Sequence, residues 1–146
     1  SDRNKAIAYY LKSKDIFDED PNEILDLYIR SCSIGTNVVD LSHFGAVLAN
    51  KGFGLYETRD LIPESIVSII VSQMSSCGMY EKSGRYLMDV GIPSKSGVSG
   101  AILGIVPDLC GIAVYSPRLD KTGNSVRGME LLKILSYELD LNIFIR

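Results

Sequence analysis

The sequence is poor in the residues that build metal sites and disulfide frameworks. It has one histidine, His43, and three cysteines, Cys32, Cys77 and Cys110, and no two cysteines have the C-x-x-C spacing of a zinc or redox site. An odd number of cysteines leaves at least one thiol unpaired, and we expect all three to lie in apolar surroundings. The sequence therefore predicts buried free thiols of a reducing compartment and no metal site.

Long apolar runs and an excess of one charge are also missing. No stretch approaches the roughly 18 apolar residues of a membrane span, and the charged residues 1–5 lack the apolar core of a signal peptide. The formal net charge is −3, with acidic and basic residues interspersed, which leaves no basic surface for nucleic acid or an anionic membrane. We therefore expect a cytoplasmic protein that binds neither.

The first 60 residues predict helices. A short helix contains Ile7 and Leu11, and a second begins at Asp20-Pro21, where a capping carboxylate precedes a proline at the first helical position. Asp40 is expected to cap a third helix. Because the chain starts without methionine and enters a helical pattern at once, we expect a piece of a longer protein.

The remaining residues predict an α+β arrangement. A helix is expected from Pro63 to Cys77, with Gly78 ending it in a left-handed conformation. Strand-like runs follow at residues 86–90, 101–106 and 111–115. The turn pair Pro107-Asp108 predicts that the last two runs form an antiparallel hairpin, and a final helix is expected over residues 124–139.

The tripeptide Lys95-Ser96-Gly97 is the first indication of chemistry. Enzymes that acylate a serine carry a comparable Lys-Thr-Gly strand together with an S-x-x-K motif that supplies the nucleophile. No serine of this chain is followed three residues later by lysine. The sequence therefore predicts one wall of a serine-acylating pocket whose nucleophile lies outside these residues.

Six motifs occur in the order that the C-terminal part of the serine-dependent glutaminases carries them. They are Ser1–Asn4, Leu25–Tyr28, Leu48–Gly52, Cys77–Tyr80, Gly91–Gly100 and Ser116–Ser125. The chain thus resembles this family over nearly its whole length. The resemblance implies an α+β fold like that of β-lactamases and penicillin-binding transpeptidases, with helices followed by an antiparallel sheet segment packed on helices. Residues 1–60 would belong to the helical subdomain and residues 61–146 to the C-terminal part of the α+β subdomain of one catalytic domain.

The same resemblance implies hydrolysis of L-glutamine to L-glutamate and ammonia through a serine acyl-enzyme, without metal or organic cofactor, in a homo-oligomer. Asn4 and Tyr28 match substrate-binding positions. Tyr80 matches the tyrosine beside the nucleophile and the scissile amide, which makes it the catalytic candidate and a further substrate-binding residue. Val98 matches the residue whose backbone N–H belongs to the oxyanion hole. The family's nucleophile motif precedes residue 1, so we expect this chain to need the N-terminal half of the same enzyme. We also expect the four residues to converge on one cleft.

Each of these residues has a structural alternative. By burial habits alone, Tyr28 is more often a core tyrosine, and Asn4 is more often a helix cap or an exposed side chain. The glycines beside Val98 equally fit a bulge or a turn. Tyr80 follows a helix-ending glycine on a loop, where a phenol projects outward, while Lys95 is expected to be solvated and is not included in the site.

Two other function classes fit part of the pattern. Another serine acyl-transfer enzyme of the same fold, such as a β-lactamase or a peptidase, would carry K-S-G among different motifs, whereas D-R-N and C-G-M-Y favour a glutaminase. A non-catalytic binding or oligomerisation module would need only this segment. We expect His43 to be a surface residue, residues 15–20 to form a solvated loop, and residues 120–125 to build a turn and a helix cap.

Overall fold

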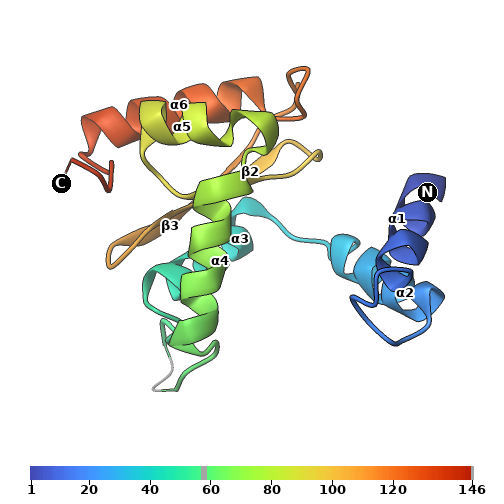
Figure 1. The fold of residues 1–146 in the computed structure, drawn as a ribbon. Coiled ribbons are helices and arrows are strands. Elements are labelled where there is room, and N and C mark those ends of the chain that lie inside the picture. Colours follow the sequence, from blue (N-terminus) through green and yellow to red (C-terminus); the bar gives the residue numbers. More distant parts are fainter. Residues whose placement is uncertain (57–58, 146) are drawn as a thin grey trace. The chain divides into compact units, whose positions relative to one another are not determined.

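The computed structural model describes residues 1–56 and 59–145 (Figure 1). The chain forms two compact units, residues 1–36 and residues 37–146. The division expected after residue 60 concerns the subdomains of a whole catalytic domain and stays a prediction.

The first unit is a pair of helices. α1 spans Asp2–Lys12 and α2 spans Pro21–Cys32. The Asp20 side chain accepts a hydrogen bond of 2.8 Å from the Asn22 backbone N–H, with Pro21 at the first helical position, as predicted. Ala8 and Leu25 are buried, whereas residues 15–20 form an irregular connection that is mostly exposed.

The second unit is built around a three-stranded antiparallel sheet. β1 (Ser94–Ser96), β2 (Ala101–Val106) and β3 (Cys110–Tyr115) lie in that order, with Lys95 opposite Leu103 and Ile102 opposite Val114. The predicted hairpin of β2 and β3 is therefore confirmed. Side chains alternate across β2, so Ile102 and Val106 face one side of the sheet and Leu103 and Ile105 face the other.

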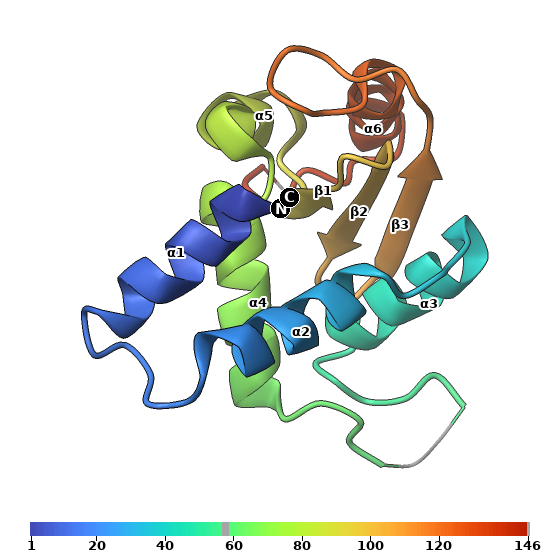
Figure 2. The same cartoon turned by 90° about the vertical axis from the view of Figure 1, so that its right-hand side faces the viewer.

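Helices cover both faces of this sheet (Figures 1 and 2). α3 (Val38–Ala49) and α4 (Glu64–Cys77) pack on the Leu103 side through a cluster that includes Leu48, Val67 and Met74. α5 (Ser83–Val90) and α6 (Val126–Glu138) cover the Ile102 side through Tyr86, Val90 and Leu132. Figure 2 shows that α3 and α4 lie on one side of the sheet and α5 and α6 on the other. The buried core of the second unit is thus a three-layer α+β arrangement.

Two predictions about the strands and helix caps of this unit were wrong. Residues 86–90 form part of helix α5, because Tyr86 and Val90, four residues apart, both face the core, and Gly91 ends the helix with φ of 67°. α3 begins at Val38, where the Asn37 side chain accepts from the backbone N–H groups of Val39 and Asp40. Asp40 therefore lies within the first turn and does not cap it.

The left-handed conformation predicted for Gly78, which follows α4, was wrong, and glycine is needed there for a different reason. Gly78 has φ of −68°, a right-handed conformation. A Cβ atom at this position would lie 1.8 Å from the Ser94 carbonyl oxygen, so only glycine lets the end of α4 approach β1 so closely. The backbone N–H of Ser96 also donates to the Gly78 carbonyl oxygen at 3.0 Å.

The cysteines are free but not buried. Cys32 and Cys77 are exposed, and Cys110 is partly buried, so the prediction of free thiols is confirmed and that of buried thiols is wrong. Cys32 and Cys77 are the last residues of α2 and α4, and their immediate neighbours are Ser31 and Ser33, and Ser76 and Gly78, none of which is a large apolar residue that would bury the thiol. His43 is exposed on α3, as expected.

The structure also bears on membranes and metals, within the residues that it describes. In residues 1–56 and 59–145, no helix has both the length and the apolar character of a membrane span. Over the same residues, the side chains of histidine, cysteine, aspartate and glutamate form no group of three that could hold a metal ion.

Candidate active site

Asn4 and Tyr28 line one pocket of the helical unit. Asn4 lies inside α1, and Tyr28 on α2 is 55% exposed, so the helix cap and the core tyrosine are both excluded. The pocket has a volume of about 290 Å³. Its remaining lining is apolar: Ile7, Ala8, Leu11, Phe17, Ile24 and Leu25. Two polar side chains thus stand at the wall of an apolar hollow, an arrangement that can orient a small polar ligand.

Tyr80 and Val98 lie close together in the second unit. Tyr80 opens a single 3₁₀ turn, Tyr80–Lys82, between α4 and α5, and its side chain is 40% exposed. A Cβ atom placed on Gly123 would lie 3.5 Å from Cε2 of Tyr80 and 3.7 Å from Cγ1 of Val98. These two predicted residues therefore approach the same point from different loops.

Val98 lies in the tight connection between β1 and β2. The Gly97 N–H donates to the Ala101 carbonyl at 2.9 Å, and the Gly100 N–H donates to the Gly97 carbonyl at 3.0 Å. The turn proposed as the structural alternative is thus present. It leaves the Val98 N–H without a hydrogen-bond acceptor among the described residues, and Val98 is 73% exposed. A backbone donor in that situation is free to bind a developing oxyanion.

Lys95 is a residue that the sequence analysis left out of the site. Its ammonium group lies 4.6 Å from the centroid of the Tyr80 ring and donates a hydrogen bond to the Ser96 carbonyl oxygen. Lys95 is exposed on β1, as expected. Partial desolvation of its ammonium group lowers the pKa of Lys95, and the electrostatic interaction with Cys77 acts in the opposite direction. The signal was the strand itself: Ser94 and Ser96 face inward, so Lys95 between them must face the Tyr80 side.

Ser96 is not available as a nucleophile. It is fully buried, and its hydroxyl donates a hydrogen bond of 2.6 Å to Oδ1 of Asn124. The serine of K-S-G is therefore a structural residue, which agrees with a nucleophile supplied from elsewhere.

Residues 120–125 form the predicted turn and helix cap and also an ion pair that was not predicted. Asp120 accepts from the backbone N–H groups of Thr122 and Asn124, and the Ser125 hydroxyl caps α6 by accepting from the Gly128 N–H at 3.0 Å. Asp120 also pairs with Lys82 at 2.6 Å. Burial raises the pKa of Asp120, but the hydrogen bonds from Lys82, Asn124 and Thr122 together hold it well below its usual range.

Tyr86 shows what a structural tyrosine looks like in this unit. Its hydroxyl lies 2.9 Å from Oγ of Ser94, which in turn donates to the Ile92 carbonyl. Burial raises the pKa of Tyr86 to about 12, and the Ser94 hydrogen bond acts against this rise. Tyr80, partly exposed beside an ammonium group and an open N–H, has no such buried hydroxyl partner among the described residues.

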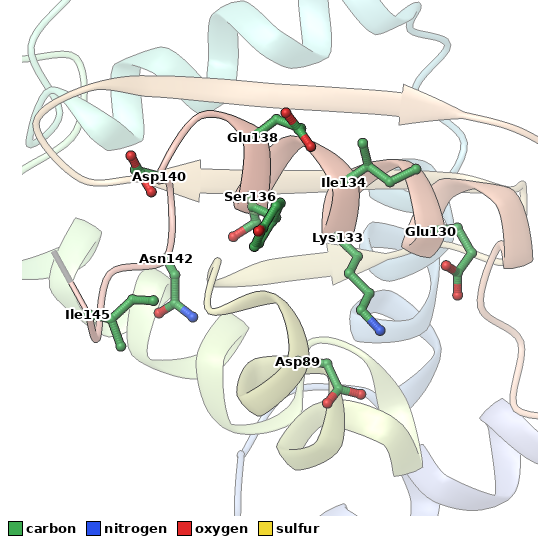
Figure 3. A pocket seen from close by; sticks show the side chains of 10 residues that line it. Asp89, Glu130, Lys133, Ile134, Ser136, Glu138, Asp140, Asn142 and Ile145 are labelled. Atoms are coloured by element: carbon green, nitrogen blue, oxygen red, sulfur yellow. The ribbon is translucent and has the colours of Figure 1, made fainter.

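A larger hollow lies elsewhere and has different chemistry. It encloses about 850 Å³ between α5, α6 and the C-terminal segment, and contains none of the predicted site residues (Figure 3). Lys133 faces it together with Asp89 and Glu130. The hydroxyl of Ser136 donates its hydrogen bond to the Val90 carbonyl oxygen. This hollow offers no activated nucleophile.

The predicted site residues therefore fall into two pairs. Asn4 and Tyr28 share a pocket of the first unit, and Tyr80 and Val98 share a position in the second. The convergence of all four on one cleft stays a prediction.

Comparison with known proteins identifies the family. The Glutaminase family model matches residues 1–144. The chain is 46% identical over 143 residues to Glutaminase 2 of Clostridium perfringens, covering 98% of this chain and 47% of that protein. It is 47% identical over 143 residues to a glutaminase of Clostridioides difficile, covering 98% of this chain and 46% of that protein. The chain thus spans about half the length of the curated relatives it matches.

Comparison with solved structures agrees with this family assignment. The chain is similar, with a TM-score of 0.93 and 38% identity, to a Bacillus subtilis glutaminase in covalent complex with 5-oxo-L-norleucine, covering 97% of this chain and 51% of that one. It is also similar to Mglu in its tris and glutamate form, with a TM-score of 0.94 and 39% identity over 99% of this chain and 32% of that one. The expected β-lactamase-like fold is therefore confirmed.

Proposed function

Because the chain belongs to the glutaminase family, we propose that it is the C-terminal half of an enzyme that hydrolyses L-glutamine to L-glutamate and ammonia. The observation that carries this proposal is the approach of Tyr80 and Val98 to one point beside the Lys95-Ser96-Gly97 strand. A proton-bearing hydroxyl and an open backbone N–H are two of the groups that amide cleavage needs.

The proposed reaction runs through a serine ester. A serine hydroxyl from the N-terminal half attacks the side-chain amide carbon, and the carbonyl oxygen becomes an oxyanion that the Val98 N–H stabilises. The nitrogen takes up a proton and leaves as ammonia, and water then releases glutamate from the serine. Tyr80 relays the proton or orients the nucleophile. One oxyanion donor contributes on the order of 100-fold in rate or more, and no metal or organic cofactor takes part.

Asn4 and Tyr28 have a different task in this proposal. Their pocket has apolar walls and two polar side chains, which suits the methylene chain of glutamine with polar groups at its end. We therefore assign them to substrate binding and Tyr80 to the chemistry.

The proposal also includes two binding partners of the chain and its location in the cell. The N-terminal half of the enzyme supplies the nucleophile, and a second copy forms a homo-oligomer. Leu131, Ile134 and Tyr137 form an exposed apolar stripe along α6, which supports burial against another surface. Free thiols support a cytoplasmic protein. Light scattering of the full-length protein and fractionation of cells test these two points.

Ammonia release from glutamine tests the function itself. The full-length protein should release ammonia, and the 146-residue chain should release none above background, because it lacks the nucleophile. Turnover by the purified chain would contradict the assignment of the nucleophile to the other half. A full-length protein that leaves glutamine intact and opens a β-lactam ring would replace this proposal by the second function class.

A further inference from the structure

We propose that Asn124 is a positioning residue that holds Tyr80 in place for the reaction. This inference rests on the proposed function, because it assigns Asn124 to the site in which Tyr80 acts. Asn124 has no exposed surface and touches no atom that would react. Its amide joins the K-S-G strand to the backbone immediately before Tyr80.

The hydrogen bonds of Asn124 leave one orientation for its amide. Nδ2 lies 3.1 Å from the Met79 carbonyl oxygen, which can only accept, so Nδ2 must be the donor. Its second hydrogen goes to Oγ1 of Thr122 at 2.9 Å. Oδ1 then accepts from the Ser96 hydroxyl at 2.6 Å. Both amide hydrogens and the amide oxygen are used, so replacing Asn124 by alanine removes all three contacts.

A second connection lies on the other side of Tyr80. The Lys82 ammonium group pairs with Asp120 at 2.6 Å, and Asp120 accepts from the Asn124 backbone N–H at 3.0 Å. The same turn thus contacts the residue before Tyr80 and the residue two positions after it. Ser83 completes the arrangement, since its hydroxyl accepts from the Met79 N–H and donates to the Tyr80 carbonyl.

Tyr80 needs such support because of its backbone. Its φ of 54° lies in the left-handed region, which a bulky side chain adopts only where its surroundings hold it. Its ring is partly exposed and contacts Lys95 from one side. Asn124 and the Lys82–Asp120 pair therefore fix the backbone from which the ring projects, and the position of the hydroxyl follows from that backbone.

The test is a double-mutant cycle in the full-length enzyme with glutamine. Asn124→Ala should lower kcat by about 10- to 100-fold, since a displacement of about 1 Å has effects of that order, and KM should stay within a few-fold. If Asn124 acts through Tyr80, adding Asn124→Ala to Tyr80→Phe should change kcat by no more than about 2-fold. Losses that multiply in the double variant would overturn the proposal, as would wild-type kcat in either single variant.

Ser136→Ala is the matched control. Ser136 is buried in the same unit and loses one hydrogen bond, to the Val90 carbonyl, but lies outside the 120–124 turn. It should lower the unfolding midpoint and leave kcat unchanged. A fall in kcat equal to that of Asn124→Ala would show a general loss of stability and overturn the positioning role.

A second variant covers the case in which Asn124→Ala does not fold. Lys82→Met removes the other connection at a partly exposed side chain and should lower kcat roughly 2- to 5-fold, again only when the Tyr80 hydroxyl is present. If wild-type protein releases no ammonia, the proposed function fails, and crystal structures of the same variants decide the positioning role. A displaced Tyr80 ring would support it, and an unchanged ring would overturn it.

Discussion

The two units of this chain differ in how much of their structure is held by a core. In residues 1–36, two helices bury Ala8 and Leu25, and the pocket of Asn4 and Tyr28 is open at the surface. In residues 37–146, apolar clusters fill both faces of a sheet, and hydrogen bonds surround the backbone of Tyr80. We infer that the residues proposed for substrate binding stand on an adaptable unit and those proposed for the chemistry on a rigid one.

Hydrogen exchange on the 146-residue chain should show the largest contrast. A two-helix unit of this size is below the roughly 40 residues at which a domain folds alone. Amides of α1 and α2 should therefore exchange on the order of 1000-fold faster than those of β2 at Ile102–Ile105, which open only with the whole core. Equal protection of the two units would contradict the comparison.

A glycine in the rigid unit gives the next largest effect. Gly78→Ala would place a methyl group 1.8 Å from the Ser94 carbonyl, and backbone cannot move away as a side chain can. We expect a loss of about 3 kcal/mol or more in the free energy of unfolding. Gly84→Ala is the control, since nothing lies within 4 Å of its added methyl group on α5, and it should stabilise by up to about 1 kcal/mol. Denaturant unfolding of the full-length protein measures both.

Removing the hydroxyl of Tyr80 should affect the chemical step. In the full-length enzyme, Tyr80→Phe should lower kcat on the order of 100-fold or more while KM stays within a few-fold, because a group used in proton transfer acts in the transition state. Steady-state kinetics with glutamine provides the measurement. A wild-type kcat would mean that Tyr80 only forms part of the pocket wall.

The same substitution in the helical unit should affect binding instead. Tyr28→Phe removes one neutral hydrogen bond, which is worth about 0.5–1.5 kcal/mol, so KM should rise about 10-fold or less with kcat unchanged. A large fall in kcat in this variant would place chemistry on the adaptable unit and reverse the comparison.

The sequence predicted those features whose signals are local. The α2 cap at Asp20-Pro21 and the β2–β3 hairpin follow from neighbouring residues. The run at residues 86–90 was misread because Tyr86 and Val90 suit a strand as well as a helix, and burial against Leu132 and Ile102 decides for the helix. The cap of α3 was missed because Asn37 stands three residues before the Asp40 that has the same capping chemistry.

Some residues of the candidate site were likewise predicted from the sequence, and others were not. Asn4, Tyr28, Tyr80 and Val98 were predicted from the order of the motifs. The hydrogen bond from Asn124 to the Met79 carbonyl joins residues 45 positions apart, and neither periodicity nor motif spacing predicts such a pair. The orientation of Lys95 could have been predicted from the sequence, because side chains alternate along β1. Ser94 and Ser96 face the buried side, so Lys95 between them faces the other side.

A crystal structure of the full-length protein with bound L-glutamate tests the central proposal most directly, namely that Asn4, Tyr28, Tyr80 and Val98 all contact the substrate. We expect one glutamate molecule to contact the side chains of Asn4 and Tyr28, with the Val98 N–H and the Tyr80 hydroxyl at its side-chain carboxylate. Glutamate held by the residues of one unit alone, with the other pair turned to a separate surface, would contradict the claim.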